Sequence, residues 1–250
     1  MDHTRKIIIK QFILLTLILL YSCGASHDIV EEVIYKDAAF SYNHLKKNEV
    51  AIGGIASQQI FFTDVERIQY SSLLSTILIE QLKDVHNINI INTSQLMQRI
   101  GQENYFDLMK DIDVEQRLID EAMQFLKDEI PDIEYMIIAT IENENIIDRS
   151  NRERIKDETG KDKYETYYNK TYFITVKFQI YDLFQEKIIW NILMYNKAER
   201  SETRTTDTGC VESCVSGAIN SILFGSPAEI SREEVLSEIF NKFAEKLAKQ

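Results

Sequence analysis

The sequence predicts an α/β protein, a single-domain α/β sandwich in which helices pack on a mixed sheet that carries a long antiparallel hairpin. Three observations predict this class. Short apolar runs alternate with amphipathic stretches in the first half, a period-two segment follows, and a capped amphipathic helix comes last. The chain has 250 residues and is 44% hydrophobic, which is ample for a real core.

Buried strands are predicted in the first half of the chain. Short apolar runs bounded by polar or small residues are typical of strands covered on both faces. Three such runs occur, at residues 50–55, 88–91 and 135–141. The third is apolar almost throughout, which favours a central position in the sheet.

Amphipathic helices are predicted between these strands. Apolar residues recur at helical spacing over 64–85 and over 118–126, where Pro131 follows. A further helix begins near residue 94, with Thr93 or Ser94 as its cap.

Two glycines, Gly53 and Gly54, follow the first predicted strand. Such a pair invites comparison with a phosphate-binding loop, but the chain has neither G-x-G-x-x-G nor a Walker lysine. We therefore expect a close strand-to-helix turn at this point.

The second half of the chain predicts a hairpin and a closing helix. Apolar and polar residues alternate cleanly from Tyr172 to Ile180, residues 182–186 form a turn, and residues 187–195 return as a partner strand. Ser231-Arg-Glu-Glu234 is a capping box that opens the last helix.

A highly charged excursion separates these halves, over residues 142–166, with a turn expected at 157–163. Its C-terminal side contains Tyr164, Tyr167 and Tyr168. Tyrosine is favoured where a surface meets a partner, so these three residues are our candidate partner surface. The alternative interpretation is a solvated hairpin.

The N-terminus resembles a bacterial lipoprotein signal. Residues 1–22 combine a basic start, a short apolar core and a small residue, Ser22, immediately before Cys23. The resemblance implies cleavage before Cys23 and acylation of that residue. The alternatives are a cleaved signal with an incidental Cys23, or an uncleaved anchor.

This assignment predicts a cell-envelope protein that is lipid-anchored to a membrane and faces the periplasm. Residues 23–48 are expected to be a tether plus an N-terminal element, and residues 49–250 the α/β domain. Gly24 is not the Asp that retains lipoproteins in the inner membrane of enteric-type bacteria, so that rule favours the outer membrane.

The charge of the chain excludes some partner classes. The net charge is −12, and removal of residues 1–22, which carry a net +2, leaves −14. Such an acidic chain argues against nucleic-acid binding, which needs Lys and Arg to neutralise phosphates. It also argues against electrostatic adhesion to anionic lipid.

Two further cysteines, Cys210 and Cys214, lie four residues apart. In an oxidising compartment we expect a local disulfide between them, with free thiols or a metal site as the alternatives. The nearby apolar run at residues 219–224 is interpreted either as a packed loop helix or as an exposed patch.

No motif in the chain predicts catalysis. G-x-S-x-G, H-E-x-x-H and a catalytic Cys–His pattern are all missing from the sequence. We therefore expect no enzymatic activity, no catalytic residue, no cofactor and no resident metal.

The order of elements resembles a family of bacterial lipoproteins. The family includes the curli secretion channel lipoprotein (CsgG) and the penicillin-binding-protein activator LpoB, and the amino-terminal domain of TolB has a related fold. Four segments carry the resemblance: residues 50–55 with the following helix, Ile88–Leu96, Asp132–Ile141 and Val176–Trp190. Gln185-Glu186 departs from the family pattern, which has a Gly in this turn.

The secretion-channel branch of that family inserts two hairpins per subunit into the outer membrane, near residues 142–172 and 196–228 of this chain. In this chain, residues 146–158 and 199–207 carry charges at both even and odd positions, so either face of such a strand would put charges into lipid, which is unfavourable. The resemblance therefore implies a non-enzymatic protein-interaction or assembly module that docks another envelope protein. The alternatives are a subunit of a homo-oligomeric outer-membrane secretion channel and a cell-wall hydrolase.

Overall fold

The computed structural model describes residues 25–46, 48–59, 62–86, 88–207 and 229–249. These residues form two compact units. The first, which we call the body, consists of His27–Ile147, Thr171–Ala198 and residues 230–249. The second, which we call the ribbon, consists of residues 25–26, 148–170, 199–207 and 229.

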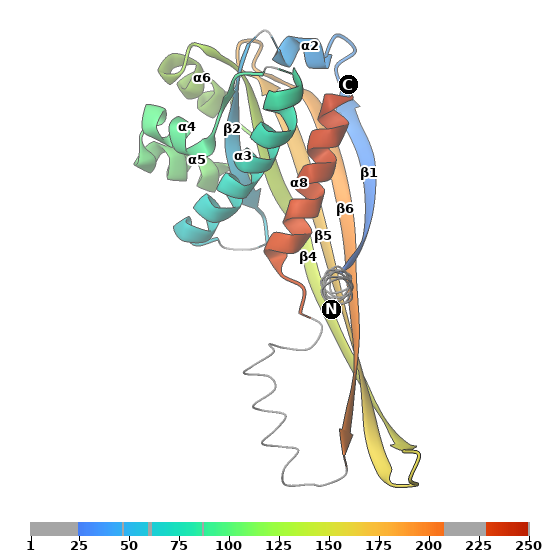
Figure 1. Cartoon of the computed structure of the whole chain (residues 1–250). Helices are drawn as coiled ribbons and strands as arrows, with labels where there is room; N and C mark the ends of the chain where they lie inside the picture. Colours follow the sequence, from blue (N-terminus) through green and yellow to red (C-terminus); the bar gives the residue numbers. More distant parts are fainter. Residues whose placement is uncertain (1–24, 47, 60–61, 87, 208–228, 250) are drawn as a thin grey trace, which may run out of the picture. The chain divides into compact units, whose positions relative to one another are not determined.

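The described strands form one mixed six-stranded sheet in the order β1-β6-β5-β4-β2-β3 (Figure 1). Strand β2 pairs in parallel with both β3 and β4, whereas β4, β5 and β6 follow one another through short turns as an antiparallel meander. The strand bounds are β1 Ser26–Lys36, β2 Glu49–Ser57, β3 Ile90–Ile91, β4 Ile133–Lys156, β5 Asp162–Asp182 and β6 Lys187–Asp207. The predicted α/β class is confirmed.

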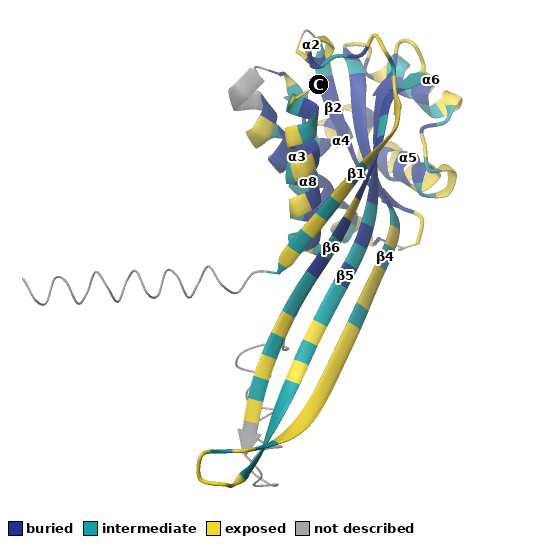
Figure 2. Cartoon of the chain, turned by 90° about the vertical axis from the view of Figure 1, so that its right-hand side faces the viewer, coloured by how far each residue is buried: buried dark blue, intermediate teal, exposed yellow. Residues whose placement is uncertain are grey.

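Six helices within the described residues accompany the sheet: α2 Tyr42–Leu45, α3 Asp64–His86, α4 Thr93–Ile100, α5 Gln102–Glu115, α6 Asp120–Glu129 and α8 Arg232–Ala248. In the body, α3 and α8 cover one face of the sheet, while α5 and α6 lie on the other (Figure 2). The body is therefore a sandwich of helices around the sheet.

Aromatic rings fill the core beneath α8. The ring of Phe178 on β5 stacks on that of Phe243 with centroids 4.0 Å apart, and Trp190 on β6 lies 5.7 Å from Phe243. All three side chains are almost completely buried. The alternating strand was predicted to turn one face, which includes Phe178, towards the core, and this packing confirms that prediction.

The opposite core joins α4, α5 and α6 to the parallel strands. Leu96, Tyr105 and Leu126 from these helices pack in one cluster with Met136 and Ile138 of β4. Helix α5 was not predicted as a separate element, because residues 102–115 mix acidic side chains with the apolar positions that this cluster buries.

The interpretation of Gly53 and Gly54 as a strand-to-helix turn is wrong. Both residues lie inside β2, where the register against β4 shifts between Ile52 and Gly54. Gly54 has φ +127°, and a Cβ there would come within 2.5 Å of the Tyr105 hydroxyl. The glycines therefore permit a bulge that is crowded by neighbouring side chains.

Other boundaries differ from the expectations in smaller ways. The expected tether region contains strand β1, and β6 continues well past residue 195. Asn92 caps α4, because its side chain accepts a hydrogen bond from the Gln95 N–H at 2.9 Å; Thr93 and Ser94 already lie inside the helix. At α8 the predicted Ser231 cap is confirmed, with its hydroxyl accepting from the Glu234 N–H at 3.1 Å.

Candidate functional site

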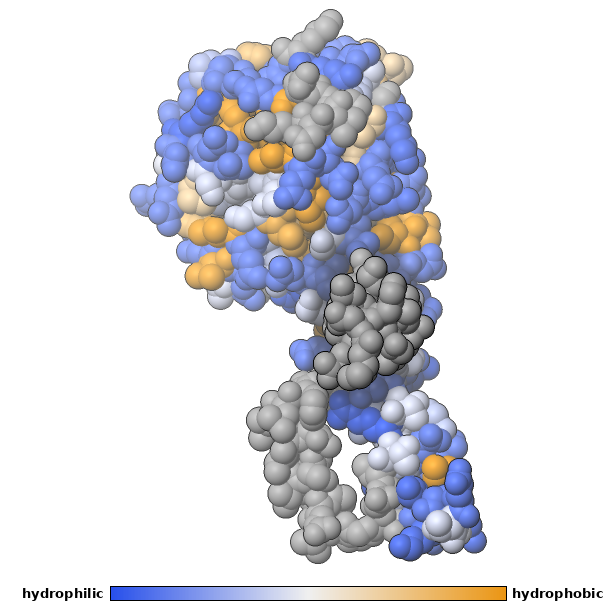
Figure 3. Space-filling view, viewed as in Figure 1, coloured by the Kyte–Doolittle hydropathy of each residue, from blue (hydrophilic) through white to orange (hydrophobic). Residues whose placement is uncertain are grey.

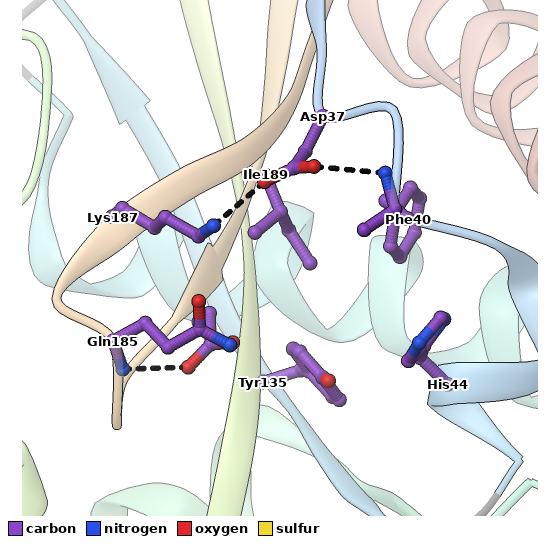
Figure 4. A pocket seen from close by; sticks show the side chains of 9 residues that line it. Asp37, Phe40, His44, Tyr135, Gln185, Lys187 and Ile189 are labelled. Atoms are coloured by element: carbon purple, nitrogen blue, oxygen red, sulfur yellow. Dashed lines mark hydrogen bonds and ion pairs between the residues drawn. The ribbon is translucent and has the colours of Figure 1, made fainter.

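A small hollow lies beside the start of β6, lined by residues that include Phe40, His44, Tyr135 and Ile189 (Figure 4). Its open volume is about 70 Å³, room for about two water molecules and far below the roughly 300 Å³ at which small-molecule sites begin. Burial raises the pKa of the Tyr135 hydroxyl, so this group stays neutral. The hollow is therefore not a substrate pocket.

An ion pair lies in the wall of this hollow and ties the end of β1 to β6. The ammonium group of Lys187 lies 2.6 Å from Oδ2 of Asp37, and the Asp37 N–H donates to the Ile189 carbonyl at 2.9 Å. The hydrogen bond from Lys187 holds the pKa of Asp37 below its usual value, and the same contact raises the pKa of Lys187. The pair acts as a clamp between β1 and β6.

A second polar cluster is buried between β2, α3 and α5. The Arg67 guanidinium, 4% exposed, donates to Asp113 at 2.5 Å and to the Ile55 carbonyl at 2.9 Å. Asp113 also accepts the Ser57 N–H at 2.8 Å. Both charged groups bind other groups of the protein, so this cluster has a structural role and holds β2, α3 and α5 together. Among the described residues, no cluster of three or more potential metal-ligating side chains occurs.

The outer strand β1 presents an unusual apolar surface. Four of its large hydrophobic residues are 45–56% exposed: Val30, Val33, Ile34 and Tyr35. We call these four residues the β1 edge. Figure 3, drawn from the same side as Figure 1, shows a hydrophobic group at the margin of the body where β1 lies.

The backbone of β1 is equally available. Within the described part of the chain β1 is the last strand of its sheet and pairs with β6 alone. Soluble proteins normally blunt such an edge with charge, proline or a bulge. In β1, Asp28, Glu31, Glu32 and Lys36 supply charge, but the four large apolar side chains between Val30 and Tyr35 stay exposed. Val30 and Ile34 lie on one face of β1 and Val33 and Tyr35 on the other, so both faces of the strand, together with its outer backbone groups, are suited to contact with another strand or an apolar partner surface.

Polar contacts hold the first half of β1 firmly against the body. The His27 ring nitrogen Nδ1 lies 3.1 Å from the Asn196 amide, and the Glu31 carboxylate pairs with Lys246 of α8. Farther along, the Tyr195 hydroxyl lies 3.5 Å from Glu32. The β1 edge therefore sits on an anchored strand, so its exposed side chains form a fixed surface.

The sequence contained a signal for this strand that our interpretation missed. Residues 29–35 read Ile-Val-Glu-Glu-Val-Ile-Tyr, rich in β-branched and aromatic residues. Apolar and polar residues do not alternate over 32–36, because both faces of the strand are exposed there and neither requires apolar side chains. Propensity, without periodicity, was the only available indication.

The predicted partner tyrosines all lie on β5 in the ribbon, but they do not form one surface. The Arg152 guanidinium lies over the Tyr164 ring at 4.1 Å, and Arg204 lies over the Tyr168 ring at 5.9 Å. Tyr167 has the opposite parity in the strand, and its hydroxyl donates to Glu165. The structure thus groups Tyr164 with Tyr168 and separates Tyr167 from them.

The other predicted site residues, Cys23, Cys210 and Cys214, lie outside the described residues, as does the apolar run at 219–224. Among the described residues, no helix is long and apolar enough to cross a membrane.

The body also has an acidic helical surface. Residues 102–129, which form α5 and α6, carry a net charge of −6. Asp107, Asp111 and Glu121 line a hollow together with apolar residues that include Leu108 and Phe125. An acidic surface of this kind repels nucleic acid.

No family model and no curated protein matches the chain. Among solved structures it is similar to a PelC dodecamer from Paraburkholderia phytofirmans, at 11% identity over 82% of this chain and 100% of that chain, with a TM-score of 0.31. It is similar to lipoprotein GNA1162 from Neisseria meningitidis, at 10% identity over 70% of this chain and 98% of that chain, with a TM-score of 0.34. It is also similar to the LpoB C-terminal domain from Salmonella enterica, at 8% identity over 69% and 88%, with a TM-score of 0.31. At these identities and scores the similarities carry no functional argument.

Proposed function

We propose that this chain is a lipid-anchored, non-enzymatic docking module of the bacterial cell envelope. In this proposal residues 1–22 are a signal peptide, Cys23 carries the acyl anchor, and the protein faces the periplasm from the outer membrane. The body binds another envelope protein, and the β1 edge is the binding surface.

The exposed β1 edge is the observation that supports the docking role. Four large apolar side chains on one strand cost hydration free energy when exposed, and burying them against a partner recovers about 25 cal/mol for each Å² of apolar surface. The outer backbone groups of β1 offer hydrogen bonds to the same partner. The clamps at Asp37 and Glu31 keep this surface in place before binding, which lowers the entropic cost of association.

Site-specific photocrosslinking tests this role in cells that express the full chain. A photoreactive amino acid replaces Ile34, and a matched control replaces Val114 on α5, which is 76% exposed. We expect a discrete protein adduct from position 34 and none from position 114.

A second substitution makes the test specific to the strand edge. Val30→Lys places a charge in the β1 edge, the device that natural edge strands use against pairing, and should abolish the adduct at position 34. Adducts of equal yield from positions 34 and 114, or an adduct at 34 that survives Val30→Lys, would contradict the proposal.

The same experiment addresses self-association. An edge strand is self-complementary, because two copies can pair antiparallel through identical surfaces. An adduct at twice the mass of the chain would identify a second copy of the chain as the partner, whereas the second candidate function, a subunit of a homo-oligomeric secretion channel, needs a heterologous contact that closes into a ring.

A further inference from the structure

The two faces of the ribbon differ in charge. Neighbouring residues of a strand point to opposite faces, so even-numbered and odd-numbered residues separate. The contacts of Arg152 with Tyr164 and of Arg204 with Tyr168 place even-numbered residues of all three strands on one face. We call this even-numbered face the Tyr164 face.

The Tyr164 face is basic although the chain is acidic. Six cationic side chains lie on it: Arg152, Arg154, Lys156, Lys170, Arg200 and Arg204. Among the strand residues 148–156, 162–170 and 199–205, three acidic side chains accompany them, which leaves +3 on this face. The opposite face of the same strand residues has two cationic and three acidic side chains and a net −1. The body carries −12 with His neutral, so the whole-chain charge conceals this basic surface.

Three of these cations have acidic partners within the ribbon: Arg154 pairs with Asp162, Arg204 pairs with Glu202, and Lys170 lies 4.0 Å from Asp148. Arg152 stacks on a tyrosine ring, a contact that leaves the charge of the guanidinium and the donors at its edge available to an anion. In Figure 3 the described part of the ribbon is mainly hydrophilic.

The length of the N-terminal segment places the ribbon near a membrane. Ser26 belongs to the ribbon, and its hydroxyl donates to the Glu199 carbonyl at 3.2 Å. Only two residues, Gly24 and Ala25, separate Cys23 from Ser26, and the three extended steps between these two residues reach about 11 Å. An acyl group on Cys23 therefore keeps this end of the ribbon at the lipid headgroups.

From these observations we propose that the Tyr164 face of the ribbon binds the headgroups of an anionic phospholipid bilayer, the one that holds the acyl anchor. The inference rests on the proposed acylation of Cys23. Lys and Arg neutralise the phosphates, and Tyr164 and Tyr168 supply rings of the kind that gather at the membrane–water interface. The acyl chains and the basic face then act together, as in other two-signal anchors.

Lysine footprinting on the acylated full chain tests this inference. Lipoprotein with its mature N-terminus verified by mass spectrometry is placed in nanodiscs of phosphatidylcholine alone or of phosphatidylcholine with phosphatidylglycerol. Amine acetylation of Lys156, on the Tyr164 face, is compared with that of Lys163, on the opposite face of the same ribbon.

We expect the labelling rate of Lys156 to fall about fivefold on the anionic discs, with Lys163 unchanged. The double variant Arg152→Glu/Arg154→Glu should remove this protection, whereas the matched control Arg149→Glu, on the opposite face, should retain it. Inorganic phosphate in place of anionic lipid should give no protection.

Other outcomes overturn the inference. Equal labelling of Lys156 on both discs means that the face does not bind lipid, and protection by inorganic phosphate means that it binds free anions. Protection that grows with protein concentration on phosphatidylcholine discs assigns the face to the acidic body of a second copy. If the mass spectrum shows an unmodified Cys23, the proposed acyl anchor is wrong. This outcome is read from the mass spectrum and not from the lysine labelling, so it is distinguished from a failure of lipid binding by the ribbon.

Discussion

The body and the ribbon share strands β4, β5 and β6, yet different forces order them. In β5, residues Thr171–Asp182 of the body alternate into two cores and end in a run of seven buried residues, whereas residues 162–170 of the ribbon include none that is buried (Figure 2). Hydrophobic burial stabilises the first stretch. Backbone pairing, ion pairs and cation–π contacts hold the second, and these are individually weak in water.

The comparison shows that one continuous strand can serve two purposes. Where β5 faces helices, its sequence is fixed by packing, and substitutions there act on stability. Where it faces solvent, the side chains are free to specify a binding surface. We therefore expect large stability effects in the body and small ones in the ribbon.

The largest effect is expected at the aromatic stack. Phe243→Ala removes a ring that contacts both Phe178 and Trp190, and should lower the free energy of unfolding by about 3–5 kcal/mol. Tyr168→Ala in the ribbon should change it by less than about 1 kcal/mol. Urea unfolding followed by fluorescence of Trp190, the single tryptophan, measures both; equal effects would contradict the division.

The buried ion pair comes next. Arg67→Met leaves the Asp113 carboxylate and the Ile55 carbonyl without their partner and should cost about 3 kcal/mol. Arg154→Met breaks an exposed ion pair with Asp162 in the ribbon and should cost less than about 1 kcal/mol. A cost for Arg154→Met as large as that for Arg67→Met in urea unfolding would show that the ribbon is ordered by its ion pairs.

Two glycines with positive φ provide a matched pair. Gly54→Ala forces a Cβ against the Tyr105 and Ser71 hydroxyls at φ +127° and should cost about 2 kcal/mol. Gly160 has φ +80° with open space around it, so Gly160→Ala carries the backbone strain without the clash and should cost about 1 kcal/mol. If thermal unfolding shows both alanines to be harmless, the crowding at the β2 bulge is not rigid.

The smallest effect is expected at the Asp37–Lys187 clamp and depends on pH. Because the pKa of Asp37 is lowered in the folded protein, its contribution to stability is present above the ordinary carboxyl pKa of about 3.9 and disappears as pH falls through the folded pKa. Asp37→Asn should therefore unfold more easily than wild type at pH 7, and the difference should shrink steadily as pH falls below the ordinary carboxyl pKa. A difference that does not change with pH in acid would show that another interaction of Asp37 dominates.

The sequence predicted those parts of the fold where one period governs a whole element. The alternation in β5, the cap at Ser231 and the parallel strands were all visible in it. It did not predict the bulge at Gly54, because a bulge depends on which side chains of α3 and α5 press against the strand. Helix α5 was missed for a related reason, since only packing shows which of its residues face the core.

The candidate surfaces were harder to predict than the fold. Tyr164, Tyr167 and Tyr168 look equivalent in sequence, and only the cross-strand contacts with Arg152 and Arg204 separate them into two faces. The β1 edge was missed because its exposure depends on β1 being the outermost described strand, a property of sheet order. The net charge of the chain correctly indicated that the body is acidic, but it concealed the basic face of the ribbon.

The central claim is that the body binds a protein partner and that the ribbon binds lipid. One crosslinking experiment, run in parallel at three positions, tests it most directly. A photoreactive residue is placed at Ile34 in the β1 edge, at Ser150 on the Tyr164 face, or at the adjacent Asn151 on the opposite face. Mass spectrometry of the adducts from intact envelopes should give a protein partner at position 34, phospholipid at position 150 and much less lipid at position 151. Lipid at position 34, or equal lipid at positions 150 and 151, would contradict the account.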